Sequence, residues 1–241
     1  MVGLGTLVNV GTVIAGSAAG FLIKKGLPEK YKNIIMQAIG LSVLIIGVSG
    51  ALQCIYTILN GAKLDRQYIM LMIFSLVIGG VIGELASIEK RLDNLGMWFQ
   101  NKFSKNSGNF AEGFVTASLV YCVGAMAIVG SLEDGLTGNT KTLFAKAVLD
   151  GVTAVVFTST MGLGVMFSAL PVLVYQGSIT LLAGVVKPWL TDPIITQMSL
   201  VGSVLIFAIG LNLLGIIKIK VGNLLPAIFI PIIYYFIHAL F

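Results

Sequence analysis

The sequence predicts an all-α, polytopic bundle of transmembrane helices with about eight spans, seven being the alternative. Of its 241 residues, 57% are hydrophobic and 29 more are glycine, and only 10% are charged. A soluble domain carries roughly 25% charged residues, and the mean hydropathy here is +0.99. Because a soluble globule must present polar residues to water, the bilayer has to be the solvent for most of this chain.

Eight apolar runs are long enough to cross a membrane, for which a helix needs about 20 mainly apolar residues. They lie near residues 3–23, 34–59, 68–86, 111–131, 142–162, 167–186, 194–217 and 221–240. Gly162, Gly164 and Pro171 blur the boundary between the fifth and sixth runs. If those two runs form one span, the count falls to seven.

Lysine and arginine near the helix ends predict the orientation, because these residues are retained on the cytoplasmic side. With the amino terminus outside, ten of the 15 positive residues fall on the cytoplasmic side, including Lys24 and Lys90. The outer side holds five, including Lys63 and Lys141. Eight spans then place both termini outside. The first positive residues follow the first run instead of preceding it, so no cleaved signal peptide is expected.

Several classes of function are disfavoured by what the chain contains. The net charge of +5 is scattered in short clusters, so no nucleic-acid partner is expected. Cys54 and Cys122 lie inside apolar runs, where a thiol behaves as a small hydrophobe, and no disulfide is expected. His238 is the one histidine, and the sequence holds none of the common catalytic or nucleotide-binding motifs. We therefore expect no enzyme activity, no cofactor and no metal site.

Residues 87–110 separate the third and fourth runs and predict an amphipathic helix. Apolar side chains recur there at helical spacing against a charged face, namely Ile88, Leu92, Leu95, Trp98 and Phe99. Such a helix lies at the membrane surface. It could sense lipids, or it could be an ordinary connector that packs on the bundle.

An internal repeat is suggested by two pairs of similar stretches. Residues 30–47 align without gaps on residues 193–210, and residues 7–12 resemble residues 173–178. Spans one to three would then correspond to spans six to eight, and the odd offset makes the copies opposite in orientation. Within one membrane domain, repeat one covers about 1–86, the central spans about 111–166 and repeat two about 167–241. Apolar helices also resemble one another by chance, which is the competing explanation.

Inverted repeats place transport sites near the membrane midplane, on interrupted helices whose backbone groups and side chains hold the solute. In the two similar stretches, a polar residue, a glycine and a hydroxyl recur in order, which predicts such interruptions. The candidate residues are Asn9, Gly11, Thr12, Tyr175, Gln176, Gly177 and Ser178. Alternatively these small polar residues only pack helices together, as Gly16 with Gly20 and Gly79 with Gly83 are expected to do.

Asp150 is the best candidate for a functional ionisable residue within a span, where charges are costly and rare. Lys146 precedes it by four residues, one helical turn, so the two side chains can pair. A purely structural ion pair is therefore the alternative to a role in ion coupling.

The other acidic residues have plainer interpretations. Glu84 and Glu112 lie near span ends, where water tolerates a carboxylate. Glu133 and Asp134 are expected in an outer loop, and Ser131 just before them could close the site.

Long blocks of the chain resemble the YdfK/YqgA family of bacterial inner-membrane proteins. The similar blocks cover residues 5–20, 114–138, 147–183 and 209–227, including the sequences VYQGS and GLNLLG. The resemblance implies a multi-pass protein of the bacterial cytoplasmic membrane. The family has no assigned activity and is described at most as a candidate transport family. Its blocks include Asp150, Tyr175 and Gln176, and they add Asn212 to the candidate site.

The favoured function is secondary transport of a small polar or ionic solute, coupled to protons or sodium through Asp150. An ion or small-solute channel is the nearest alternative, and a membrane scaffold or lipid-modifying protein is the alternative from another class. The expected partners are membrane lipids and the solute. The small-residue face at Gly16 and Gly20 could also support a homodimer.

Overall fold

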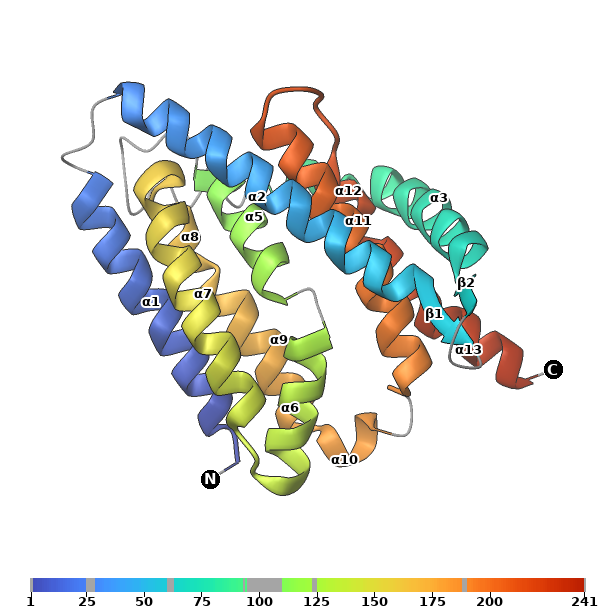
Figure 1. Ribbon diagram of the computed structural model, residues 1–241. Helices are drawn as coiled ribbons and strands as arrows, with labels where there is room; N and C mark the ends of the chain where they lie inside the picture. Colours follow the sequence, from blue (N-terminus) through green and yellow to red (C-terminus); the bar gives the residue numbers. More distant parts are fainter. Residues whose placement is uncertain are drawn as a thin grey trace. The chain divides into compact units, whose positions relative to one another are not determined.

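The structure, a computed structural model, describes residues 2–24, 29–59, 63–92, 94, 110–122, 125–187 and 190–240. The chain forms two compact units: unit 1 contains Met1–Ile39 and Arg91–Pro188, and unit 2 contains Gly40–Lys90 and Trp189–Phe241. Each unit therefore draws on both predicted repeats. Helices make up nearly all of both units (Figure 1), as the composition predicted, apart from one short β-hairpin.

Unit 1 is a helical bundle in which α1 (Leu4–Lys24) packs mainly against α7 and α9. Its other helices are α5 (Phe110–Cys122), α6 (Ala125–Thr137), α7 (Lys141–Met161), α8 (Gly164–Phe167), α9 (Ala169–Leu181) and α10 (Ala183–Val186). Helices α1 and α7 run parallel, because Gly5 near the start of α1 packs against Leu143 near the start of α7, and Gly20 packs against Val155 further along both helices. Helix α9 runs antiparallel to α1, because Thr6 lies beside Thr180 and Asn9 lies beside Gln176.

The α1–α7 contact is close because glycines on α1 let the two backbones approach. A Cβ atom added to Gly16 would lie 2.2 Å from the carbonyl oxygen of Gly151, and one on Gly20 would lie 2.3 Å from that of Val155. The expectation that this small-residue pair packs helices is thus confirmed. Helix α7 of the same chain covers the face of α1 that holds Gly16 and Gly20. The homodimer stays a prediction.

Unit 2 is built on most of α2 (Glu29–Ile55) and on α11 (Asp192–Leu213), which lie against each other in antiparallel fashion. A Cβ atom on Gly47 would lie 2.4 Å from the backbone nitrogen of Phe207, and one on Gly210 would lie 2.7 Å from that of Leu44. Four further helical segments belong to the unit, namely α3 (Ile69–Leu85), α12 (Val221–Leu224), the 3-10 helix η1 (Leu225–Phe229) and α13 (Ile230–Leu240).

A β-hairpin replaces the end of the second predicted apolar run, which was expected to stay helical to residue 59. Helix α2 ends at Ile55, and β1 (Tyr56–Leu59) pairs with β2 (Lys63–Arg66) in antiparallel register, Tyr56 facing Arg66. Aromatic and β-branched residues favour strands, and residues 56–58 are Tyr, Thr and Ile. The Arg66 guanidinium also lies over the Tyr56 ring, 6.0 Å from its centroid.

Two more apolar runs are interrupted where continuous helices were expected. The fourth run is divided between α5 and α6, which are bent by 59° at the break. The sixth run is divided among α8, α9 and α10. Helix α7 ends at Met161 and is followed by Gly162, whose φ of +88° is a conformation that glycine adopts without steric cost.

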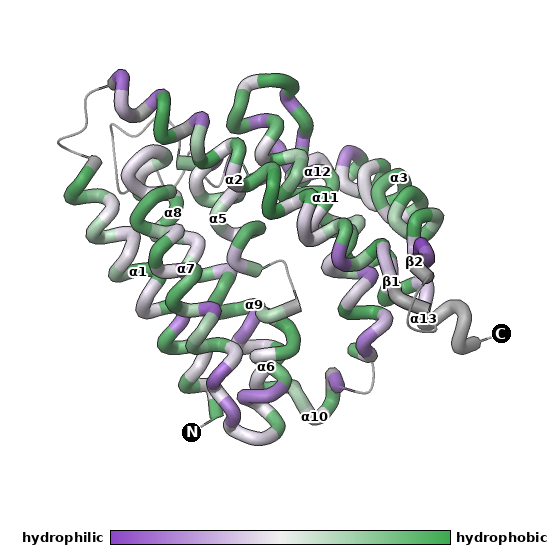
Figure 2. Tube along the Cα trace, in the orientation of Figure 1, coloured by the Kyte–Doolittle hydropathy of each residue, from purple (hydrophilic) through white to green (hydrophobic). Residues whose placement is uncertain are grey.

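Five helical stretches of the described chain are long and apolar enough to cross a membrane, with α8 and α9 together counted as one (Gly164–Leu181), or six if the bent α5–α6 pair is one span. The remaining apolar helices, Ile69–Leu85 and Val221–Tyr235, are shorter. Apolar residues dominate along the helices of both units (Figure 2). A helical membrane protein follows, whereas the count of eight spans stays a prediction. Most of the predicted amphipathic helix at 87–110 lies outside the described residues.

A buried polar network as candidate functional site

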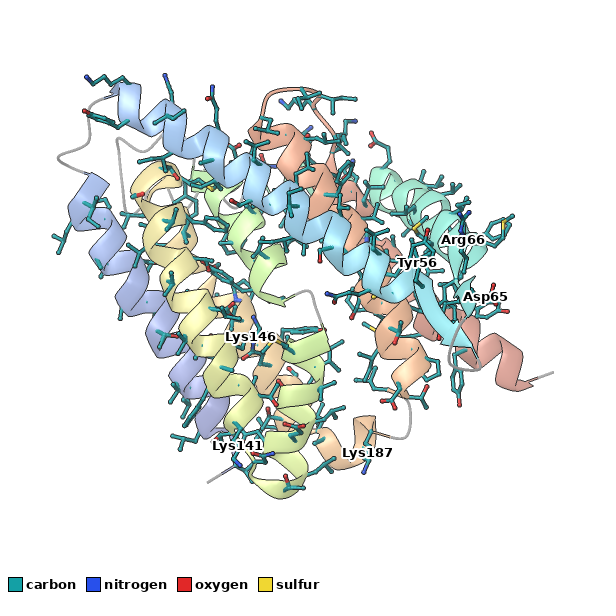
Figure 3. The ribbon with its side chains drawn as sticks, viewed as in Figure 1. Tyr56, Asp65, Arg66, Lys141, Lys146 and Lys187 are labelled. Atoms are coloured by element: carbon teal, nitrogen blue, oxygen red, sulfur yellow. The ribbon has the colours of Figure 1, made fainter. Side chains whose placement is uncertain are left out.

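An ion pair lies at the middle of α7. The Lys146 Nζ atom donates to Asp150 Oδ2 at 2.6 Å, and each residue is only 6% exposed (Figure 3 marks Lys146). Asp150 is the tenth of the 21 residues of α7. At a rise of about 1.5 Å per residue, it is about 13 Å from one end of the helix and about 17 Å from the other. The pairing expected from the four-residue spacing is confirmed.

Two amide side chains extend the ion pair onto the neighbouring helices. Asn9 on α1 donates through Nδ2 to Asp150 Oδ2 at 3.0 Å and to Gln176 Oε1 on α9 at 3.2 Å. Asn9 and Gln176 are both 0% exposed. We call these four residues, Lys146, Asp150, Asn9 and Gln176, the polar network.

The Asp150 carboxylate fixes the orientation of both amides. An ionised carboxylate only accepts hydrogen bonds, so Asn9 must present its NH₂ group to Asp150. That NH₂ group also donates to Gln176, which must therefore present its carbonyl oxygen. Asn9 Oδ1 and Gln176 Nε2 then remain, and neither has a hydrogen-bond partner among the described residues. The network thus contains one buried acceptor and one buried donor group that are available to a ligand.

Titratable side chains on α5 and α9 lie within electrostatic range of the ion pair or of one another. Tyr121, which is 0% exposed, and Cys122 are close enough to interact electrostatically with Asp150. Tyr175, a half-buried candidate residue on α9, interacts in turn with Cys122. Sequence reasoning missed Tyr121 and assigned Cys122 only a packing role, because neither has a motif that points to Asp150.

The predicted helix interruptions around Asn9 and Gln176 are not present. Residues 9–12 lie within the continuous helix α1, and residues 175–178 lie within α9. A Cβ atom on Gly11 or on Gly177 would have no described atom within 4 Å, so neither glycine serves a close contact. Both glycines are tolerated in unbroken helices, and the polar side chains reach one another without any opening of the backbone.

The remaining candidates in unit 1 lie around the network or away from it. The Thr12 hydroxyl donates to the carbonyl oxygens of Asn9 and Ala147, both at 2.9 Å, so Thr12 ties α1 to α7 next to the network. Ser131 is fully buried on α6, and its hydroxyl has no partner in the described part of the chain. Ser178 is exposed and donates to the carbonyl oxygen of Val174 on its own helix.

Asn212 belongs to unit 2, where its amide donates to and accepts from the backbone of Ile219, both at 2.8 Å, and so holds a turn. Its assignment to the site stays a prediction. The prediction of a loop at residues 133 and 134 was wrong. Glu133 and Asp134 lie in helix α6 and not in a loop. Asp134 is fully buried and accepts from the backbone N–H groups of Gly3 and Gly5, which secures the start of α1.

The fold and the network define a helical membrane protein with a charged, hydrogen-bonded site among three of its helices. The chain belongs to the family described as "Protein of unknown function (DUF554)", which matches residues 4–236. It is similar to the "Uncharacterized membrane protein YdfK" of Bacillus subtilis (strain 168), with 39% identity over 98% of this chain and 97% of the relative. It is also similar to the "Uncharacterized protein YqgA" of Escherichia coli (strain K12), with 28% identity over 93% of each chain. No solved structure matches. The family resemblance inferred from the sequence is thereby confirmed.

Proposed function

We propose that this protein is a secondary transporter of a small polar or ionic solute and that the polar network is its solute and coupling site. The observation that carries the proposal is the pair of unpartnered amide atoms, Asn9 Oδ1 and Gln176 Nε2, in fully buried side chains. A buried polar group without a partner costs about 1 to 3 kcal/mol. A bound polar solute would remove that cost, because it supplies the missing partners.

The position of the network supports transport over a structural role. Ionisable residues inside membrane spans mark ion and substrate pathways, because their burial is otherwise unfavourable. Asp150 lies near the middle of a helix that is long enough to span the bilayer. Transport sites commonly lie at that depth.

The register between α2 and α11 supports the inverted repeat. The gap-free alignment of residues 30–47 on 193–210 equates Leu44 with Phe207 and Gly47 with Gly210. In the structure Gly47 lies against Phe207, and Gly210 lies against Leu44. Exchange of the two copies thus maps this pair of contacts onto itself. Every antiparallel helix pair has a local twofold axis, but a slip of one residue would move that axis away from the place that the alignment requires.

On this proposal the family forms eight spans, with spans one to three repeated by spans six to eight in opposite orientation. The eight would be the five long helices, the bent α5–α6 pair and the two shorter apolar helices. Asp150 would carry the coupling ion or proton, and the amides of Asn9 and Gln176 would hold the solute.

The test compares two variants of α9 in a ligand screen. Purified protein is screened by thermal unfolding against amino acids, sugars, carboxylates and inorganic ions, since a bound solute stabilises the fold. Gln176→Ala should weaken binding of any solute found by about 5- to 150-fold, which corresponds to the loss of about 1 to 3 kcal/mol. Ser178→Ala is the matched control, because Ser178 is exposed and bonded to its own helix. Its affinity should equal that of the wild type.

Flux measurements then separate the classes of activity. In proteoliposomes a transporter gives saturable uptake that an imposed proton or sodium gradient can drive. Asp150→Asn should keep solute binding and lose gradient-driven accumulation, because it keeps the shape of the side chain and removes its titration. Flux without saturation would indicate a channel. A protein that binds no solute and transports none, and that tolerates Gln176→Ala without any change, would refute the proposal.

A further inference from the structure

The charges of the polar network cancel, and this balance restricts which solutes the network can take. Lys146 and Asp150 are each 6% exposed and 2.6 Å apart, so the ammonium has one carboxylate as its immediate counter-ion. An uncompensated charge in a buried site is strongly unfavourable. Any loaded state must therefore keep the site neutral.

We propose that the network binds a small monovalent anion, such as a carboxylate, together with one proton, an inference that rests on the transport function proposed above. The proton adds to an oxygen of the Asp150 carboxylate and forms its O–H bond. Lys146 then loses its counter-ion and pairs with the anionic group of the solute. The empty site holds one positive and one negative charge, and so does the loaded site. Proton and anion enter together, and their combined movement carries no net charge.

The unpartnered amide atoms fit this loaded state. The Gln176 NH₂ group has no acceptor among the described residues, and an anion is a strong acceptor. With the proton on Asp150 Oδ1, the Oδ2 atom keeps the hydrogen bond that Asn9 donates, and the new O–H group can donate to the anion. The Asn9 amide therefore keeps its orientation and its hydrogen bond to Gln176. Asn9 Oδ1 remains as an acceptor for a donor group of the solute, such as the hydroxyl of a hydroxy acid.

Other loads fit the network less well. A cationic solute would add a second positive charge beside Lys146. A sodium ion would have to share Asp150 Oδ2 with that ammonium, and such hard cations need several oxygen ligands. No group of three acidic, histidine or cysteine side chains able to hold a metal ion occurs in the described chain. A neutral solute could satisfy both amides, but it would leave the ion pair intact and give no coupling.

Asp150 is the residue of the network whose charge changes when the proton binds. Other charged and titratable groups lie on its own helix and on neighbouring helices. Lys146 lies on its own helix, and Tyr121 and Cys122 on α5 interact with it. Helix α1 presents Asn9, an amide that does not titrate. On α6, the two acidic residues are engaged elsewhere, Glu133 with the Thr142 hydroxyl and Asp134 with the backbone at the start of α1. Tyr175 on α9 interacts electrostatically with Cys122.

The experiment measures binding of chosen anions by purified protein at two pH values. Formate, L-lactate and nitrate are supplied as choline salts at pH 5.5 and pH 7.5, with formamide and glycerol as neutral probes of similar size. We expect at least one anion to stabilise the protein. Its apparent Kd should fall by about tenfold for each unit of decreasing pH, because one proton is taken up with it. A pH indicator in weakly buffered solution should register about one proton per bound anion.

Variants of the ion pair sharpen the test. Asp150→Asn imitates the protonated acid, so it should bind the anion at both pH values without proton uptake. The double variant Lys146→Gln with Asp150→Asn is neutral and should lose anion binding at both. It also keeps the test available if the single variant does not fold. Glu84→Gln is the matched control, since Glu84 pairs with Lys220 at 2.8 Å in unit 2, and it should behave as the wild type.

The outcomes separate this inference from the transport proposal. Stabilisation by neutral probes or by sodium alone, still lost in Gln176→Ala, would overturn the anion inference and leave the transport site standing. Anion binding that is independent of pH in the wild type, or that survives in the double variant, would also overturn it. If no probe of any class stabilises the protein and Gln176→Ala changes nothing, both proposals fail.

Discussion

Substitution of Gly16 by alanine tests the contact that positions the polar network. A methyl group at this site would lie 2.2 Å from the carbonyl oxygen of Gly151, whereas side-chain carbons essentially never approach a heavy atom more closely than 3.0 Å. The Gly151 carbonyl oxygen on α7 belongs to the backbone and cannot rotate away, so α1 has to move outward by about 0.8 Å. A rigid shift of this size would lengthen the Asn9 to Asp150 hydrogen bond from 3.0 Å to as much as about 3.8 Å.

The expected loss of stability follows from three contributions. Overpacking costs about 1 to 3 kcal/mol, and weakening of a hydrogen bond to a charged group costs up to about 1.5 to 3 kcal/mol. Alanine has a higher helix propensity than glycine, and this difference stabilises the variant by about 1 kcal/mol. We therefore expect Gly16→Ala to lower the free energy of unfolding by about 1.5 to 5 kcal/mol and to weaken solute binding as well.

Gly11→Ala provides the matched control on the same helix, because a methyl group there would meet no described atom within 4 Å. It should be neutral or stabilising by up to about 1 kcal/mol. The assay is equilibrium denaturation in mixed micelles of detergent and dodecyl sulfate, followed by circular dichroism. Equal stability of Gly16→Ala and Gly11→Ala would refute the close α1–α7 packing on which the geometry of the network depends.

Three further predictions concern residues outside the network. Asp134→Ala should lower stability by about 0.5 to 2 kcal/mol in the same denaturation assay, because the start of α1 loses two backbone hydrogen bonds; an unchanged midpoint would contradict this. Asn212→Ala should lower stability by about 1 to 3 kcal/mol through its lost bonds to Ile219, yet leave solute affinity at the wild-type value. In intact cells, an impermeant maleimide should label Lys63→Cys and not Lys24→Cys in a cysteine-free background, and labelling of position 24 would reverse the proposed orientation.

The helical class and the ion pair could be predicted because both depend on local spacing. Long apolar runs must form helices in a bilayer, since every backbone group has to be satisfied within the segment. Lys146 and Asp150 are four residues apart, which places them on one face of α7 wherever that helix packs. No tertiary information is needed for either inference.

Asn9 and Gln176 were identified from the repeated pattern of a polar residue, a glycine and a hydroxyl, although the mechanism inferred from that pattern was wrong. The pattern predicts an opening of each helix, whereas α1 and α9 continue through it. What brings the two amides together is the packing of α1 against both α7 and α9. The pattern could not reveal that Asp150 would be their common neighbour, because 141 residues separate it from Asn9.

Asp134 shows where sequence reasoning fails for the opposite reason. The local sequence, rich in glycine and acidic residues, is typical of a loop, and a helix forms there because its face is buried against α7 and α9. The partners of Asp134, Gly3 and Gly5, are about 130 residues away in the chain. Only the tertiary fold places the carboxylate at the start of α1.

The polar network is poorly explained as a device for stability. Replacement of a buried ion pair by apolar residues of similar volume is often neutral or stabilising, and the unpartnered atoms of Asn9 and Gln176 add a cost of their own. Helices α1 and α7 are already held together by backbone contacts at Gly16 and Gly20. A solute that fills the missing hydrogen bonds removes the cost that the empty protein carries. Binding is therefore the process in which this arrangement becomes favourable, and the stabilisation of the fold by solute is its direct measure.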